Sequence, residues 1–430
     1  MKLPWQITEP IDAKTFAEIR HAAIFDCCKW DPQVEDICTL SPLPLVLAPE
    51  AWAELVSLAE KLARETVAAE TAILRHHRGL KQLGLPWMLR RKLLDAEILK
   101  NESRHLRLIR FDFHFTTDGW RISEANSDVP GGFNEASGFT KLIARHCRDM
   151  VPAGDPTAEM VRTISEVVPK NGTVALVHAT AFSDDRQVMV FLSRRLQEAG
   201  LKAVLAAPDH LRWENGKAFL DTDWARGPVD FVFRFFPTEW LKDLPCRCGW
   251  WHLLGGSQTP LCNPASAIIS QSKRFPLLWN ELPVSMPAWN ALLPRTFDLR
   301  RVDKSNPSLV FKPAFGRVGD MIKMSGINTE KEERAIDRSI RRYPHMWIAQ
   351  ERFEAVPLRT AAGDFFPCIG IYTLNTRVIG AYGRMARRPL IDHLAQDTAI
   401  LVAEPVSQPQ NQPIQIIHHD PSRTFQTVGA

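Results

Sequence analysis

The chain has 430 residues, of which 45% are hydrophobic and 24% charged, and its formal net charge is +4. This length predicts two or three packed units, and so small a net charge gives no reason to expect a nucleic-acid partner. There is no secretory signal pattern and no run of roughly 18 apolar residues for a membrane span. Because the eight cysteines lie mostly in apolar contexts, we expect a cytoplasmic protein that does not bind a membrane.

The N-terminal region, residues 1–105, is predicted to be helical. Apolar residues recur near helical spacing along 49–77, and the segment 80–100 continues this character. From the sequence alone, its role is packing against the rest of the chain.

A β-hairpin is predicted after residue 107. Apolar and polar residues alternate along 108–115 and again along 120–126, with a turn at 117–119. Side chains two apart project from one face of a strand, so Arg110 shares a face with Asp112, and Glu124 with Asn126. Two carboxylates and an amide oxygen suit Mg²⁺. The alternative is the polar outer face of an ordinary hairpin.

A parallel α/β layer is predicted over residues 172–265. Strands at 172–178, 202–206 and 230–235, with a helix at 186–199, form the signature of a βαβ unit. No glycine fingerprint of a dinucleotide-binding fold accompanies them.

The C-terminal part has a mixed pattern. We expect a helix at 272–281, two strands joined by a glycine-containing loop in 308–322, a polar helix at 330–342 and a strand at 345–353. Lys312 at a strand end, followed by a flexible loop, can hold phosphate oxygens. Gln350 and Glu351 end a strand whose backbone groups could meet an adenine edge. The tail after residue 404 is rich in Pro and Gln, and we expect it to be poorly ordered.

The order of these segments resembles the glutathionylspermidine synthase family, whose ligase domain is an ATP-grasp fold with its sequence order permuted. The family's first motif is matched by Arg110-Phe-Asp-Phe, then Asp118-Gly119, then Glu124-Ala-Asn-Ser-Asp128. Further matches follow in the family's order at 230–240, 263–279, 312–319 and 380–384. The resemblance covers residues 106–402.

This resemblance implies an α/β (α+β) ATP-grasp fold in permuted order that uses ATP and Mg²⁺. It divides the chain into the helical N-terminal region (1–105), a metal-binding hairpin and helix (106–150), a preATP-grasp-like layer (172–265), the ATP-grasp lid and core (266–404), and a tail (405–430). The implied roles are magnesium binding for Asp112, Glu124 and Asn126; nucleotide binding for Lys273, Lys312, Gly316, Arg317, Gly319, Gln350 and Glu351; and contact with the carboxylate and the transferred phosphoryl group for Arg110 and Arg384.

The chain also departs from the family pattern. The segment from Val129 to Gly132 reads Val-Pro-Gly-Gly where the family has serines that help hold glutathione, and we expect no amidase domain before the ligase part. Asp397 could be the acidic residue that follows Arg384 in the family. Asp184 and Asp185 fall where the family receives a polyamine, although an acidic helix N-terminus explains them equally well.

The function that the resemblance implies is an ATP-dependent carbon–nitrogen ligase. ATP would phosphorylate a small-molecule carboxylate, and an amine would attack the acyl phosphate. Two alternatives stay open: a catalytically silent nucleotide-binding protein of the same fold, and a phosphotransferase that stops at the phosphorylated product. The sequence identifies neither substrate and does not give the oligomeric state.

Overall fold

The computed structural model describes residues 3–6, 8–34, 36–76, 79–316, 319 and 321–404. Two predictions therefore lie outside the described residues, namely the role of Arg317 and the order of the tail 405–430. Within the described part of the chain, no helix is both long and apolar enough to cross a membrane.

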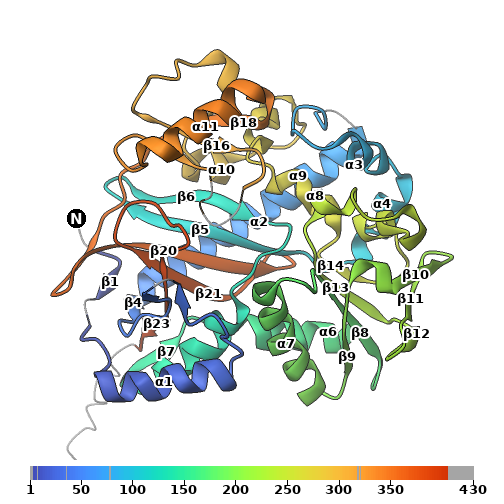
Figure 1. The fold of residues 1–430 in the computed structure, drawn as a ribbon, viewed down its shortest axis with the longest axis horizontal. Helices are drawn as coiled ribbons and strands as arrows, with labels where there is room; N and C mark the ends of the chain where they lie inside the picture. Colours follow the sequence, from blue (N-terminus) through green and yellow to red (C-terminus); the bar gives the residue numbers. More distant parts are fainter. Residues whose placement is uncertain are drawn as a thin grey trace, which may run out of the picture.

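An antiparallel sheet with the strand order β22-β21-β20-β5-β6 forms the centre of the molecule (Figure 1). The predicted hairpin is confirmed as β5 (Leu108–Thr116) and β6 (Gly119–Asn126). The remaining strands come from late in the chain, and β19 pairs with β20 beside the main order. They are β19 (Leu358–Thr360), β20 (Gly363–Leu374), β21 (Arg377–Ala386) and β22 (Gln396–Thr398).

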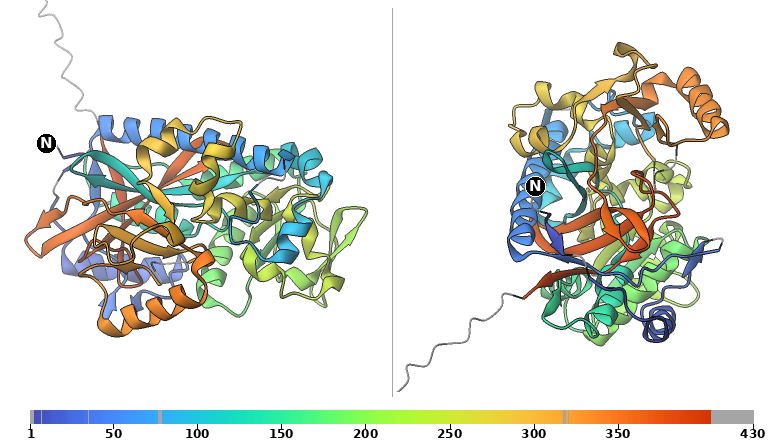
Figure 2. Two further views of the ribbon diagram at one scale, coloured as in Figure 1. Left: turned by 90° about the horizontal axis from the view of Figure 1, so that it is seen from above. Right: turned by 90° about the vertical axis from the view of Figure 1, so that its left-hand side faces the viewer.

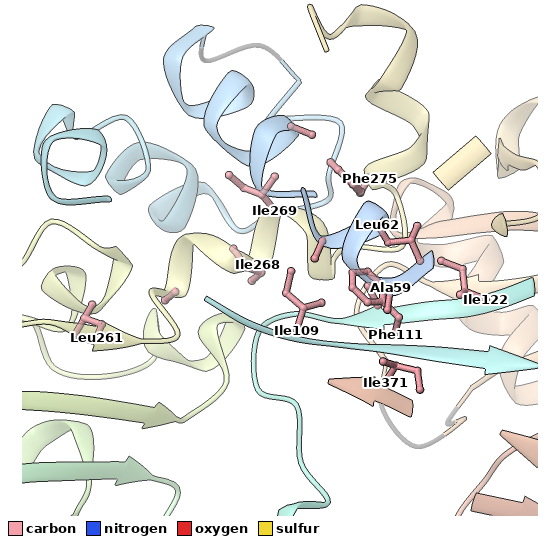
Figure 3. Close-up of a cluster of buried hydrophobic side chains, with 14 of the residues drawn as sticks. Ala59, Leu62, Ile109, Phe111, Ile122, Leu261, Ile268, Ile269, Phe275 and Ile371 are labelled. Carbon is pink, nitrogen blue, oxygen red and sulfur yellow. The ribbon is translucent and has the colours of Figure 1, made fainter. Parts of the chain in front are cut away.

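One face of this sheet is covered by the long helix α2 (Pro49–His76), which the sequence predicted. Figure 3 shows Ala59 and Leu62 of this helix beside Phe111 and Ile122 of the hairpin. Fully burying one such large side chain stabilises the fold by about 1.5–3 kcal/mol. Because the apolar residues of β5 face α2, its alternate polar residues project from the opposite face of the sheet.

The predicted parallel layer is confirmed as a sheet with the order β14-β13-β8-β9. Apolar residues from this sheet and from its helices form a second core. The elements are β8 (Thr173–His178), β9 (Lys202–Ala206), β13 (Phe231–Phe235), β14 (Leu261–Cys262), α6 (Pro156–Val167), α7 (Ser183–Glu198) and α8 (Thr238–Leu241). A small antiparallel sheet lies beside them, made of β10 (Leu211–Glu214), β11 (Lys217–Asp221) and β12 (Arg226–Pro228).

A third layer, the lid sheet, has the antiparallel order β15-β18-β16-β17 and packs against the predicted polar helix, α11 (Glu330–Arg342). Ile336 and Ile340 of α11 are buried with Phe311 and Trp347 of the sheet. Figure 2 shows this layer as a separate lobe beside the central sheet. Its strands are β15 (Thr296–Asp298), β16 (Leu309–Pro313), β17 (Lys323–Met324) and β18 (Trp347–Glu351).

Two predictions in this part of the chain were wrong in detail. The helix expected at 272–281 is instead the short α9 (Ile268–Gln271) followed by a 3₁₀ helix, Phe275–Glu281. Ser272 is extended between them, and its hydroxyl donates to the carbonyl of Leu83. Pro276 has no N–H to offer an α-helix. Of the two strands expected in 308–322, β16 lies there, whereas its partner β17 begins after that segment.

The N-terminal region contains strands as well as the predicted helices. Strand β4 runs parallel to β23 near the other end of the described chain, within the order β1-β4-β23-β7. The strands of this sheet are β1 (Trp5–Gln6), β4 (Leu45–Leu47), β7 (Met150–Pro152) and β23 (Ile400–Ala403), and β2 (Gln33–Val34) pairs with β3 (Ile37–Cys38). The other helices are α1 (Ala13–Phe25), α3 (Trp87–Lys92), α4 (Ala96–Asn101), α5 (Thr140–Ala144) and α10 (Pro287–Leu292).

Candidate functional site

Asp112, which is 1% exposed, lies at the centre of the predicted site. The nitrogens Nε and Nη2 of Arg110 lie 2.7 and 3.0 Å from its two carboxylate oxygens. Arg384 Nη2 and Asn126 Nδ2 each lie 3.0 Å from Oδ2. The strand register sets Asp112 opposite Glu124, and Arg110 opposite Asn126. The structure therefore brings the three predicted metal ligands together with both predicted arginines.

The space for this cluster depends on Gly370, which the sequence analysis missed. Gly370 pairs with Asp112 across β20 and β5. A Cβ atom here would lie 2.7 Å from Arg110 Cδ and 3.0 Å from Asp112 Oδ1. Only glycine leaves room for the Arg110–Asp112 ion pair. No local signal marks this glycine, because its role comes from a neighbouring strand far away in the sequence.

Glu124 and the two predicted phosphate lysines lie where the lid sheet meets the hairpin. Lys273 Nζ is 2.9 Å from Glu124 Oε2 and 3.2 Å from the carbonyl oxygen of Gly316. Lys312 Nζ donates to Gln350 Oε1 at 2.7 Å and to the carbonyl oxygen of Ser123 at 3.1 Å. Lys312 of the lid strand β16 and Lys273, which follows α9, therefore both contact residues of β6.

The charges of this group follow from burial and from the neighbouring ions. Burial opposes ionisation of Glu124, but the attraction of Lys273 outweighs it and lowers the pKa of Glu124 to about 2. Burial lowers the pKa of Lys312 to about 8, and Glu124 opposes this shift. Burial also lowers the pKa of His114, a neighbour of Lys312, to about 4. At neutral pH the site therefore contains an ionised Glu124 and a neutral His114.

Two cavities meet at this cluster. A cavity of about 80 Å³ between the lid and the central sheet is lined by Lys312, Gly319, Gln350 and Glu351, among others. A second cavity, of about 360 Å³, is lined by residues of the hairpin, the parallel layer and the N-terminal region. Glu124 and Arg384 line both. Molecules bound in the two cavities would thus face each other across these two side chains.

The described residues of the glycine loop approach neighbouring backbone closely. Gly319 has φ +70°, and a Cβ there would clash with the carbonyl oxygen of Ile391. Gly316 contributes the carbonyl oxygen that faces Lys273. Arg317 lies outside the described residues, so its predicted role stays a prediction.

The Gly131-Gly132 bend is fitted between two tyrosines that the sequence analysis also missed. The carbonyl oxygen of Gly131 accepts hydrogen bonds from Arg110 Nη1, at 2.9 Å, and from the hydroxyl of Tyr372. Gly132 has φ +93°, and a Cβ there would lie 3.0 Å from the Tyr372 hydroxyl and 3.1 Å from the Tyr382 ring. The Tyr382 ring in turn lies 5.1 Å from the guanidinium of Arg110. The two glycines therefore let the backbone at 131–132 pack closely against Tyr372, Tyr382 and Arg110.

Other motif residues hold the scaffold rather than the site. Asp128, the last residue of the E-x-N-x-D match, accepts from Arg234 Nη2 at 2.6 Å and from the backbone N–H of Thr238 at 2.9 Å. Gln271 Oε1 accepts from the backbone N–H groups of Ser127 and Asp128 at 2.8 and 3.0 Å. These bonds tie the end of β6 to the parallel layer and to α9, which positions Glu124 and Asn126.

The larger cavity has an acidic lining. Asp184 and Asp185 lie on it from the first turn of α7, and Asp397 lies on it from β22. Asp397 accepts a hydrogen bond of 2.5 Å from the Tyr382 hydroxyl and lies 3.0 Å from the ammonium of Lys29. Lys29 comes from the N-terminal region, and nothing in its local sequence indicated that it would reach this cavity.

The layers described above form an ATP-grasp-like fold of mixed α and β structure. The chain belongs to the glutathionylspermidine synthase preATP-grasp family, whose model matches residues 45–402. Lys29 therefore precedes the matched part.

A solved structure has the same fold class. A glutathione synthetase-like effector from Globodera pallida superposes with a TM-score of 0.60 at 12% identity, covering 91% of this chain and 99% of its own. At that identity the likeness shows the fold alone. D-alanyl-alanine synthetase A from Vibrio cholerae gives a TM-score of 0.30 at 12% identity, covering 56% of this chain and 91% of its own. This similarity is too weak to show a shared fold. No curated protein sequence matches the chain.

Proposed function

We propose that this chain is an ATP- and Mg²⁺-dependent carboxylate–amine ligase that forms an amide through an acyl phosphate and releases ADP. The observation that carries the proposal is the meeting of two cavities at Glu124 and Arg384. The smaller cavity is lined by Lys312, Gln350 and Glu351, which we assign to ATP, and the larger one would hold the other substrates. Phosphoryl transfer needs this kind of juxtaposition, because positioning and charge stabilisation do most of the catalytic work.

ATP would bind between the lid and the central sheet. Lys273 and Lys312 are aimed at the space beside Glu124, where their ammonium groups would contact phosphate oxygens. The loop of Gly316, Arg317 and Gly319 would close over the phosphates. The end of β18, at Gln350 and Glu351, would offer its backbone to the adenine edge.

The donor set fits Mg²⁺. Asp112 and Glu124 supply two carboxylates, and Asn126 supplies an amide oxygen when its side-chain amide turns over. Among the described residues no group of three or more His, Cys, Asp or Glu side chains could hold a metal. A magnesium site in a protein uses one or two carboxylates and leaves other positions to substrate phosphates. When bound there, Mg²⁺ would neutralise charge on the transferring phosphoryl group.

Arg110 and Arg384 would act on the reacting groups. Both guanidinium groups are buried against Asp112, which fixes their direction, and both line the larger cavity. Arg110 would hold the substrate carboxylate, and Arg384, shared by both cavities, would contact the phosphoryl group in transit. An amine entering the acidic cavity would then displace phosphate from the acyl carbon, losing its proton as the amide bond forms.

The test is ADP release from purified protein with panels of carboxylic acids and amines, followed by mass spectrometry of each positive pair. The proposal expects ADP formation that needs both substrates and a product joined by loss of water. ADP release with the acid alone and a stable phosphorylated product would favour the phosphotransferase. Nucleotide binding without turnover across the panels would favour the silent nucleotide-binding protein.

The eight cysteines are free thiols, which supports a cytoplasmic location.

A further inference from the structure

A buried cation, Lys29, is part of the lining of the larger cavity. The residue is 5% exposed, and its ammonium lies 2.8 Å from Glu135 Oε1, 3.0 Å from Asp397 Oδ2 and 3.1 Å from Asp31 Oδ1. All four side chains line the cavity that also contains Arg110 and Arg384. The mechanism proposed above uses none of these four residues.

The backbone around Lys29 is anchored. The N–H of Trp30 donates to Gln187 Oε1 on α7 at 2.7 Å. A few residues further on, the carbonyl oxygen of Thr39 accepts from the N–H of Asp397 at 2.6 Å. Hydrogen bonds at Trp30 and at Thr39 therefore hold the segment that carries Lys29 in place beside the three carboxylates.

The Lys29 ammonium is permanently charged. Burial would lower the pKa of Lys29, but the attraction of Asp397 and Glu135 outweighs it and raises that pKa well above its usual value. A protein can bind an alkylammonium ligand in the same way, by surrounding its buried ammonium with carboxylates. Here the chain's own side chain occupies that position.

We propose that Lys29 is a specificity-determining residue that fills an ammonium subsite of the amine cavity. The amine co-substrate then places no ammonium at Asp31, Glu135 and Asp397, so the favoured class is a monoamine or an amino acid rather than a polyamine with a second ammonium for these carboxylates. The preference for one class of amine rests on the proposed ligase function, whereas the ammonium subsite can be tested by binding alone.

The first test is chemical rescue of Lys29→Ala by n-propylammonium, which matches the part of the side chain that the substitution removes. Lys29→Ala should unfold at a lower temperature than wild type, and n-propylammonium should restore much of the loss, whereas tetramethylammonium at equal ionic strength should not. Wild type should not respond. Lys29→Met, which keeps the bulk without the charge, should be destabilised and should not be rescued, because the space stays filled.

The matched control is Lys141→Ala. Lys141 also forms an ion pair, with Asp155, but its side chain is 44% exposed, so its removal opens no enclosed subsite. This variant should not respond to n-propylammonium. If Lys29→Ala folds only in the presence of n-propylammonium, the proposal is supported. Equal behaviour of Lys29→Ala in both ammonium salts would overturn it.

The second test is substrate preference with the acid that ADP release identifies. Lys29→Ala should raise the ratio of kcat/KM for putrescine or spermidine over n-butylamine by roughly tenfold, whereas an unchanged ratio would contradict the proposal. If no acid and amine support turnover, the ligase function fails and the rescue experiment still tests the subsite. If turnover occurs but Lys29→Ala shows no rescue, the subsite alone is wrong.

Discussion

Replacing Glu124 with Gln removes one negative charge from the point where the two cavities meet. Its carboxylate lies 2.9 Å from Lys273 Nζ, and unit charges at about this distance attract each other by roughly 4–6 kcal/mol at an effective dielectric constant near 20. The amide of Gln still accepts a hydrogen bond from Lys273, so we expect the free energy of unfolding to fall by only about 1–3 kcal/mol. The folded state should persist.

The effect of Glu124→Gln on turnover should be larger. The variant loses a charged magnesium ligand and leaves the phosphoryl transition state less neutralised, which should cost about 3–4 kcal/mol, or roughly a hundredfold to a thousandfold in kcat. The assay is ADP release under saturating substrates, with circular dichroism to verify folding. Glu70→Gln is the matched control, because Glu70 also forms a buried ion pair, 2.6 Å from Arg107, but lies on α2. Near wild-type ADP release by Glu124→Gln would refute the metal assignment, whereas Glu70→Gln should lose stability and keep activity.

Three further predictions follow from the same geometry. Gly132→Ala should lower the free energy of unfolding by about 1–3 kcal/mol, because φ is +93° and the new Cβ would press on Tyr372 and Tyr382; an unchanged denaturation midpoint would contradict this. Affinity for a non-hydrolysable ATP analogue should be highest below pH 8 and should fall as pH rises through the pKa of Lys312, about 8, because the phosphates bind the protonated amine. Calorimetry at several pH values would measure this affinity, and Lys312→Met should remove its fall near pH 8. With glutathione, spermidine, ATP and Mg²⁺ we expect no efficient conjugate by mass spectrometry, because Gly131 and Gly132 offer no hydroxyl donors; efficient conjugation would make this expectation wrong.

The hairpin could be predicted because its information is local. Apolar and polar residues alternate along both strands, which puts Arg110 and Asp112 on the same face of β5, and Glu124 and Asn126 on the same face of β6. A turn ending at Gly119 joins the two strands. The structure then brings these four side chains to hydrogen-bonding distance of their neighbours. Helix α11 was predicted with its observed bounds from its polar segment, and the structure adds a capping box at Thr329, directly before the helix.

Other parts of the site depend on contacts that no local pattern records. Gly370 matters because Arg110 and Asp112 lie against it on a neighbouring strand, and Lys29 matters because Asp397 pairs with its segment from the far end of the chain. The expected helix at 272–281 failed because Ser272 bonds to the distant Leu83 and breaks the helix before Pro276. Motif resemblance brought in Lys273, Lys312 and Arg384, whose separate local patterns are ordinary.

The most direct test of the central claim is the stability of wild-type protein with a non-hydrolysable ATP analogue, with and without Mg²⁺. A ligand that binds only the folded state stabilises it by mass action, about 2.7 kcal/mol at a hundred times its dissociation constant. The proposed site requires a saturable rise in melting temperature that is much larger with Mg²⁺ than without it, and that shrinks in Glu124→Gln. No rise at millimolar analogue with Mg²⁺ present would contradict nucleotide binding between the lid and the central sheet, and with it the proposed ligase.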